Sequence, residues 1–228
     1  AARLAKIAVE AAKRAKIAAA ARAIAAAAAR ARVRAARILR DYIHCNTVGY
    51  LRSSSGIRPY MGSCGMSKVC RSYYAIATYR PGRSYVTQSS TWSTWIFRHK
   101  RSYGRTALHF GDEVSIHMNA TNAHLITCGY STCSGQLAVS ARPGNSYPRK
   151  NITENWWRIV SPRGKSGHIK KTDEIKLLNL WGGTYYLNVC SYTRDCGSAA
   201  FYQVTGTRVG TRDAGHPNSN WTFNTNYT

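Results

Sequence analysis

The sequence repeats itself three times with a period of 62 to 64 residues. Three cysteine pairs recur at this spacing, with 64 and then 62 residues between their first members, Cys64, Cys128 and Cys190. Three tryptophans recur at spacings of 62 and 64 residues: Trp95, Trp157 and Trp221. A period of this length indicates one structural unit copied three times. The repeated part of the chain is therefore expected to fold into a domain with approximate threefold symmetry.

Each repeat offers four short runs with the alternation typical of β-strands. In the middle repeat these runs are "EVSIHM", "HLITC", "QLAVSA" and "WWRIV". Three repeats of four strands resemble the β-trefoil superfamily, which includes ricin-type lectins and MIR-type domains. The resemblance implies a mainly β head over residues 41–228, and a three-bladed or sandwich arrangement is the alternative. The ricin-type Gln-x-Trp signature is absent, because its glutamine position holds Ser93, Asn155 and Ser219.

The repeats are expected at about 41–110, 111–171 and 172–228, beginning at "DYIHC", "DEVSI" and "DEIKL". This alignment makes Ile43 equivalent to Val114 and Ile175, and strand alternation predicts that all three point inward. It also aligns Cys45 with two apolar residues predicted to be buried, Ile116 and Leu177. Trp95, Trp157 and Trp221 are expected in the core, where each aromatic side chain buries roughly 150–250 Å².

Residues 1–40 have a different composition, with twenty alanines, eleven Lys or Arg residues and one acid, Glu10. Ala, Arg, Lys and Leu favour helices, and this segment has no Gly or Pro to interrupt one. We expect one helix, about 60 Å long at 1.5 Å per residue. The first glycine of the chain is Gly49, so no flexible linker follows the helix. The helix is therefore expected to project from the head.

The apolar face of this helix changes side along its length. The apolar residues of 1–16 share one half of the helical wheel, whereas those of 30–40 lie on roughly the opposite half. A helix with a single partner keeps a single apolar face, so this pattern favours several neighbours. The side chains expected to make assembly contacts are Leu4, Ile7, Glu10, Ala11, Ile17, Ile24, Ile38 and Leu39.

An N-terminal assembly helix that continues into a β-rich head resembles pilin architecture. The resemblance implies a subunit of an extracellular filament or pilus-like fibre, a helical homopolymer whose partners are copies of itself. The alternative is a secreted β-trefoil lectin whose basic helix binds an anionic surface or polysaccharide, since the net charge is +24. Nucleic acid is a less favoured partner, because the cysteine usage indicates an extracellular compartment.

The two cysteines of each pair are separated by four or five intervening residues and are expected to form local disulfides rather than zinc sites. The predicted pairs are Cys64–Cys70, Cys128–Cys133 and Cys190–Cys196. Each closes a short loop and is worth roughly 2 kcal/mol on the chain-entropy estimate. Cys45 is left over, and we expect a buried thiol, with a bridge between subunits as the alternative. Four Asn-x-Thr sequons predict N-linked glycans at Asn119, Asn151, Asn220 and Asn226.

The motifs of catalysis are not found in the sequence, so we expect no enzyme activity and no cofactor or metal. Asp112–Glu113 and Asp173–Glu174 start equivalent strands, which favours a structural role over a paired-carboxylate site. The seven histidines have no metal-ligand spacing. Tyr130 and Tyr192 occupy the same place in two cysteine loops, where they are candidates for stacking on sugar rings.

Overall fold

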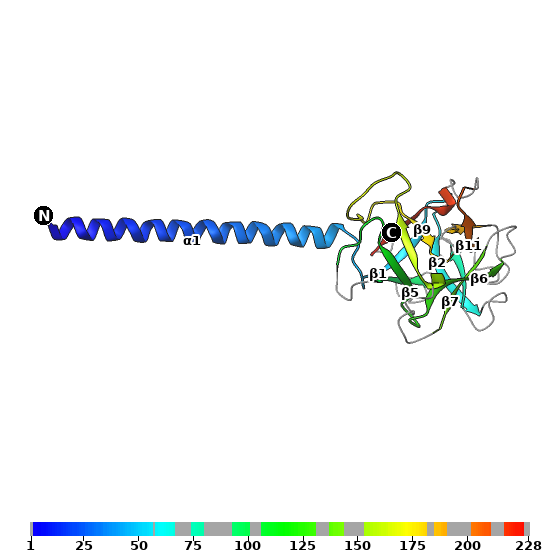
Figure 1. Ribbon diagram of the computed structural model, residues 1–228. Helices are drawn as coiled ribbons and strands as arrows, with labels where there is room; N and C mark the ends of the chain where they lie inside the picture. The colour runs from blue at the N-terminus through cyan, green and yellow to red at the C-terminus, as the bar shows by residue number, and fades with distance from the viewer. Residues whose placement is uncertain are drawn as a thin grey trace. The chain divides into compact units, whose positions relative to one another are not determined.

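The computed structural model divides the chain into two compact units, Ala1–Asp41 and Tyr42–Thr228 (Figure 1). The second unit is called the head below. The structure describes residues 2–56, 58–66, 74–79, 93–100, 106–130, 137–143, 153–181, 185–190, 202–210 and 217–225.

The first unit is a single helix, α1 (Ala2–Asp41). Its composition accounts for the helix, because alanine and the long basic side chains lose little conformational freedom in this conformation. Two ion pairs between side chains four residues apart support it, Glu10–Arg14 at 3.7 Å and Arg37–Asp41 at 3.5 Å. Such exposed pairs contribute only about 0.2–0.5 kcal/mol each. No helix among the described residues is long and apolar enough to span a membrane.

The described part of the head contains twelve strands, four in each repeat, which confirms the mainly β prediction. The first repeat holds β1 (Val48–Ser53), β2 (Tyr60–Met66), β3 (Tyr74–Tyr79) and β4 (Trp95–His99). The second holds β5 (Glu113–Met118), β6 (His124–Tyr130), β7 (Leu137–Arg142) and β8 (Trp157–Val160). The third holds β9 (Lys176–Asn179), β10 (Tyr185–Val189), β11 (Tyr202–Arg208) and β12 (Trp221–Asn224).

The strand pairing has the threefold pattern of a β-trefoil. The first and last strands of the repeats form a closed ring in the order β1, β4, β5, β8, β9, β12. The link from β9 to β12 is a bridge between Ile175 and Trp221, with two hydrogen bonds of 2.8 Å. The inner strands form three hairpins, and one strand of each, β3, β7 and β11, pairs with the other two. The head is therefore β-trefoil-like.

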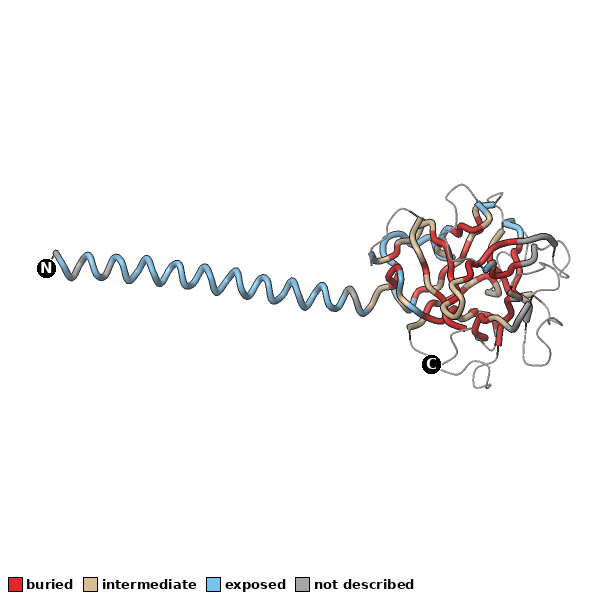
Figure 2. The backbone as a smooth tube through the Cα atoms, turned by 90° about the horizontal axis from the view of Figure 1, so that it is seen from below, coloured by how far each residue is buried: buried red, intermediate tan, exposed pale blue. Residues whose placement is uncertain are grey.

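The three repeated tryptophans lie in the core with no exposed surface. Each indole N–H donates a hydrogen bond to a backbone carbonyl in the second strand of its own repeat. Trp95 bonds the oxygen of Met61 at 2.9 Å, Trp157 that of Leu125 at 3.1 Å, and Trp221 that of Leu187 at 3.0 Å. The same contact thus ties the fourth strand of every repeat to the second. Figure 2 shows that the buried residues gather in the interior of the head.

Three segments outside the strands meet around the pseudo-threefold axis. Ile43 N–H donates to the oxygen of Ile169 at 2.9 Å, Leu108 N–H to that of Ile43 at 2.8 Å, and Ile169 N–H to that of Leu108 at 2.8 Å. All three side chains are buried. These residues are therefore structural equivalents, although their surrounding sequences differ.

The predicted alignment of the first repeat was wrong by six residues. Strand pairing places Ser53 opposite Trp221, Met118 opposite Trp95 and Asn179 opposite Trp157, so these three partners are equivalent. Counting back along each strand, the residue equivalent to Val114 and Ile175 is Gly49, not Ile43. The equivalent of Ile116 and Leu177 is likewise Leu51, not Cys45. The motif "DYIHC" gave the wrong start for the first repeat, because Asp41 ends α1 and does not begin a strand.

Gly49 replaces a branched residue because a phenylalanine already fills the space. A Cβ atom on Gly49 would stand 2.4 Å from the Phe223 ring and 2.7 Å from the carbonyl oxygen of Asn224. The Phe223 ring also packs against Phe97, with a centroid separation of 4.8 Å. The side chain that fills the core at this point is therefore Phe223 of β12, and β1 contributes none there.

Gly49→Val is accordingly expected to destabilise the head, although valine stands at the equivalent position in the second repeat. Overpacking of a filled core costs about 1–3 kcal/mol. Urea unfolding followed by tryptophan fluorescence measures this change. Val48→Thr is the matched control on the preceding, 41% exposed residue, and its unfolding midpoint should stay at the wild-type value. Equal stability of Gly49→Val and wild type would contradict this account of the core.

Candidate functional site

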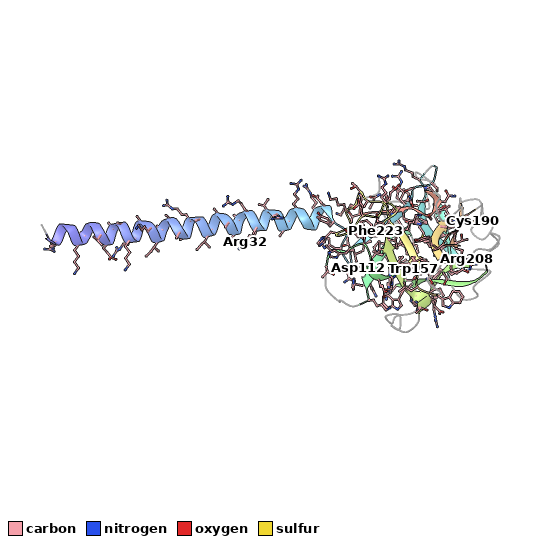
Figure 3. All side chains as sticks on the ribbon, turned by 45° about the horizontal axis from the view of Figure 1, so that its top comes forward. Arg32, Asp112, Trp157, Cys190, Arg208 and Phe223 are labelled. Carbon is pink, nitrogen blue, oxygen red and sulfur yellow. The ribbon has the colours of Figure 1, made fainter. Side chains whose placement is uncertain are left out.

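The described apolar side chains of α1 have no cover in the single chain. Relative exposures are 59% for Ile7, 69% for Val9, 61% for Ile17, 71% for Ile24 and 71% for Val33. At about 100° per residue, Ile17 and Ile24 share one side of the helix and Val33 lies on the opposite side. Figure 3 shows the side chains of α1, with Arg32 labelled, extending outward all around the helix axis. Any neighbours that cover these side chains must therefore pack against α1 on more than one side.

Other predicted assembly residues fall into two groups. Glu10 and Ala11 are exposed, and Glu10 pairs with Arg14 on its own helix. The side chains of Leu4, Ile38 and Leu39 lie outside the described part of the structure.

Of the six paired cysteines, the structure describes the side chain of one. Cys190 directly follows β10 and is disulfide-bonded. The backbones of Cys64 and Cys128 lie in β2 and β6, the repeat-equivalent strands, but their side chains are outside the described residues, as are Cys70, Cys133 and Cys196. The three pairings therefore stay predictions.

Cys45 is a free cysteine with no exposed surface. Burial raises the pKa of its thiol above the ordinary value, so the sulfur is neutral at physiological pH. A neutral, inaccessible thiol fits the expected buried cysteine and does not suit a bridge between subunits.

The two described sequon asparagines have different surroundings. Asn119 is half-buried in the turn that follows β5. The side-chain nitrogen of Asn220, which would carry the glycan, donates to Glu174 Oε2 at 3.4 Å, and Asn220 Oδ1 is buried. Asn119 is therefore the better placed of the two. Asn151, Asn226, Tyr192 and the side chain of Tyr130 lie outside the described residues.

A charged pocket opens where β4 ends, β5 begins and β8 passes beside it. Its volume is about 390 Å³, and it is lined by His99, Gly111, Asp112, Glu113 and Arg158. Strand register brings these residues together, because His99 pairs with Val114 and Glu113 pairs with Arg158. Asp112 is labelled in Figure 3. These five residues are called the charged pocket below.

Glu113 is the centre of the ion pairs in this pocket. Its Oε2 accepts a hydrogen bond from Lys100 Nζ and its Oε1 one from Arg158 Nη2, both at 2.9 Å. The hydrogen bond from Lys100 lowers the pKa of the Glu113 carboxyl, the bond from Arg158 adds to the effect, and partial burial opposes it. The carboxylate is therefore ionised and held in place from two sides.

Asp112 has a structural task that recurs in the third repeat. Its Oδ2 accepts a bond from the backbone N–H of His109 at 2.8 Å, and Asp173 accepts one from the N–H of Lys170 at 2.9 Å. Each aspartate thus closes the turn before its strand, which fits the structural role inferred from sequence. Asp112 Oδ1 also contacts His99 Nε2 at 3.3 Å.

Glu113 and Glu174, the second acids of the two pairs, do not make equivalent contacts. Glu174 lies 3.7 Å from Arg163 and accepts from Asn220, and it lines no part of the charged pocket. Sequence reasoning missed the pocket because its walls come from segments far apart in the chain. Among the described residues, no group of three His, Cys, Asp or Glu side chains is arranged to hold a metal ion.

His117 in β5 gives the head a dependence of stability on pH. Its ring contacts Ser115 Oγ at 2.8 Å and the Asn122 carbonyl at 3.3 Å. Burial lowers its pKa from 6.5 to about 3, and the positive charge of Arg98 adds to the effect. Burial also lowers the pKa of the neighbouring His124, 6.0 Å away between ring centroids.

We therefore expect the head to lose stability as the pH falls from about 6.5 toward 3. In this window the unfolded chain binds a proton at residue 117 and the folded chain does not, whereas above pH 6.5 both forms are neutral. His117→Gln should flatten this part of the curve of unfolding free energy against pH. His109→Gln is the control, at a side chain that is 45% exposed. An unchanged slope in His117→Gln would contradict the assignment.

The sequence matches none of the protein-family models and none of the curated proteins with which it was compared. Several solved structures resemble it in fold. The SDF2-like protein of Arabidopsis thaliana superposes with a TM-score of 0.62 at 18% identity, covering 80% of this chain and 94% of that one. A Caenorhabditis elegans protein of unknown function gives a TM-score of 0.59 at 15% identity, covering 80% and 96% of the two chains.

A third similar structure is the Saccharomyces cerevisiae protein O-mannosyltransferase Pmt1–Pmt2 complex bound to the sugar donor. Its TM-score is 0.60 at 14% identity, and the match covers 81% of this chain and 25% of that one. Identities at this level show a common fold. The head therefore shares its β-trefoil-like fold with these three structures.

Proposed function

We propose that this protein is a structural subunit of an extracellular filament, with the helices of many copies in the core and the heads outside. The observation that carries the proposal is the uncovered helix α1. Five large apolar side chains on it are 59–71% exposed in the single chain. Burying one such side chain stabilises an assembly by about 1.5–3 kcal/mol.

Alanine makes copies of the same helix suitable partners. Residues 23–29 hold six alanines and Ile24. Small side chains let helix axes approach to the lower end of the usual 8–10 Å. Because apolar residues lie on more than one side of α1, each helix accommodates several neighbours. Such contacts join different faces of the helix, and they generate a filament when the rotation between copies does not close into a ring.

The eleven basic residues of α1 set a condition on this packing. Their charges must face water, counterions, an outside polyanion or the Glu10 of a neighbouring copy, because an unpaired charge in a dry core is very costly. Long Arg and Lys side chains reach outward past a buried stem, so a close-packed alanine core and an exposed charge are compatible. A helix with this composition is not expected to catalyse a reaction.

Negative-stain electron microscopy of the purified full-length chain tests the filament proposal. At physiological ionic strength we expect filaments that sediment at low speed. A preparation that contains only monomers at micromolar concentration, with α1 intact by mass spectrometry, would refute it.

A second candidate function is carbohydrate binding by the head, with the basic helix attached to an anionic surface or polysaccharide. Two observations favour it: the β-trefoil-like fold shared with a complex whose structure holds a sugar donor, and the charged pocket. A glycan array probed with the full-length protein tests it, and signal for no glycan would refute it. Binding to the anionic surface alone would instead weaken steeply with salt.

A further inference from the structure

We propose that the charged pocket binds the hydroxyl groups of a neutral sugar unit; this inference rests on the carbohydrate-binding function proposed for the head. A pocket of about 390 Å³ falls within the 300–1,000 Å³ typical of small-ligand sites. Gly111 lines the pocket in a backbone conformation that favours glycine. Its φ is +98°, and a Cβ built on it would meet no heavy atom within 4 Å.

The charges of the pocket balance each other, which favours a neutral ligand. Glu113 is compensated by Lys100 and Arg158, and Asp112 faces His99 at 3.3 Å. A metal ion or a polyanion needs an excess of one sign, and among the described residues at the pocket the two carboxylates are matched by two cations, Lys100 and Arg158. Neutral hydroxyl groups need donors and acceptors in fixed positions instead.

The pocket has such positions. Each oxygen of a carboxylate offers about two lone-pair sites. The Lys100 and Arg158 bonds use one site on each oxygen of Glu113, and a sugar hydroxyl can donate to the other. The Arg158 side chain is 47% exposed at the pocket and carries further N–H donors for sugar oxygens. Charge-assisted bonds of this kind are roughly twice as strong as neutral ones.

This arrangement occurs at one of three equivalent places in the fold. Ile96, Arg158 and Thr222 each follow the repeated tryptophan, and only the second is charged. In the first repeat the pair equivalent to Glu113–Arg158 is Val48–Ile96, which is apolar. The indole hydrogen bonds of the core recur in all three repeats, whereas the ion pairs around Glu113 occur in one. The local departure from symmetry points to a ligand.

Isothermal titration of the full-length chain tests the inference, with the methyl glycosides of glucose, galactose, mannose and N-acetylglucosamine as probes and heparin as the anionic comparison. Glu113→Gln keeps the shape of the side chain and removes its charge. Glu174→Gln is the matched control at the equivalent position of the third repeat. We expect at least one glycoside to bind, Glu113→Gln to raise its Kd about tenfold or more, and Glu174→Gln to leave it within about twofold.

Arg158→Ala provides a second variant on the exposed rim of the pocket, and it too should weaken binding while the unfolding midpoint stays near that of wild type. Glycoside binding that neither Glu113→Gln nor Arg158→Ala weakens would overturn the pocket assignment and leave carbohydrate binding by the head standing. Binding of no glycoside by wild type, or of heparin alone, would overturn both.

Discussion

Deletion of residues 1–30 is expected to abolish filament formation completely while the head stays folded. The deletion removes Ile7, Val9, Ile17 and Ile24, four of the five large apolar side chains found exposed on α1. The described residues of the head's core cluster all lie within 42–228, so the unfolding midpoint of the head in urea should not change. Sedimentation and electron microscopy measure the polymer, and tryptophan fluorescence measures the head.

A full-length variant separates apolar packing from the mere presence of a helix. Ile17→Ser combined with Ile24→Ser removes two apolar side chains on one side of α1, and we expect it to raise the critical concentration for assembly at least tenfold. Arg14→Ala is the control on an exposed basic position of the same helix. Polymer formed equally well by the double serine variant and by Arg14→Ala would contradict a core made by these side chains.

Trp157→Ala is expected to remove a large part of the unfolding free energy of the head. A fully buried tryptophan cut back to alanine costs about 3–5 kcal/mol, and a domain of this size has only about 5–15 kcal/mol of stability. The change also leaves the Leu125 carbonyl in the core without its indole partner. Near-ultraviolet circular dichroism during urea unfolding measures the loss.

Trp181→Ala is the matched control for that substitution. Trp181 is 44% exposed, so its loss should change the unfolding free energy by about 0.5 kcal/mol or less. The equivalent variants Trp95→Ala and Trp221→Ala should resemble Trp157→Ala, since each loses the same hydrogen bond in its own repeat. Similar stabilities for Trp157→Ala and Trp181→Ala would contradict the threefold core.

The fold was predictable from sequence because the repeat marks the same buried contact three times. Met61, Leu125 and Leu187 stand three residues before the first cysteine of each pair, and their carbonyls accept the bonds of the repeated tryptophans. A contact needed in every repeat leaves its residues at a constant spacing. Twelve strands and a trefoil-like head follow from that spacing.

The alignment of the first repeat was shifted by six residues because the shift preserves the alternation of side chains along a strand. Side chains alternate along a strand with a period of two residues, so a shift of six residues exchanges no inward position for an outward one. Ile43 and Cys45 lie before β1, but they are buried as well, Ile43 because it bonds with Ile169 and Leu108 around the pseudo-threefold axis. Burial alone cannot detect such a shift; the strand register and the Phe223 ring over Gly49 do.

The charged pocket was not predictable in the same way. His99, Glu113 and Arg158 belong to three strands, and Glu113 and Arg158 are 45 residues apart in sequence. No spacing rule joins them, because the pairing of β5 with β8 depends on closure of the whole ring. The sequence pointed to Asp112–Glu113 as a repeated pair, but only the aspartate repeats its contact.

The central claim is that copies of α1 supply one another's missing contacts. Cryo-electron microscopy of the native particle, at a resolution that separates helices, tests it most directly. The account predicts several α1 helices around each one, with axes about 8 Å apart near Ala23–Ala29, where side chains are smallest. A reconstruction in which α1 has no helical neighbour, or in which the heads alone make the contacts between copies, would contradict it.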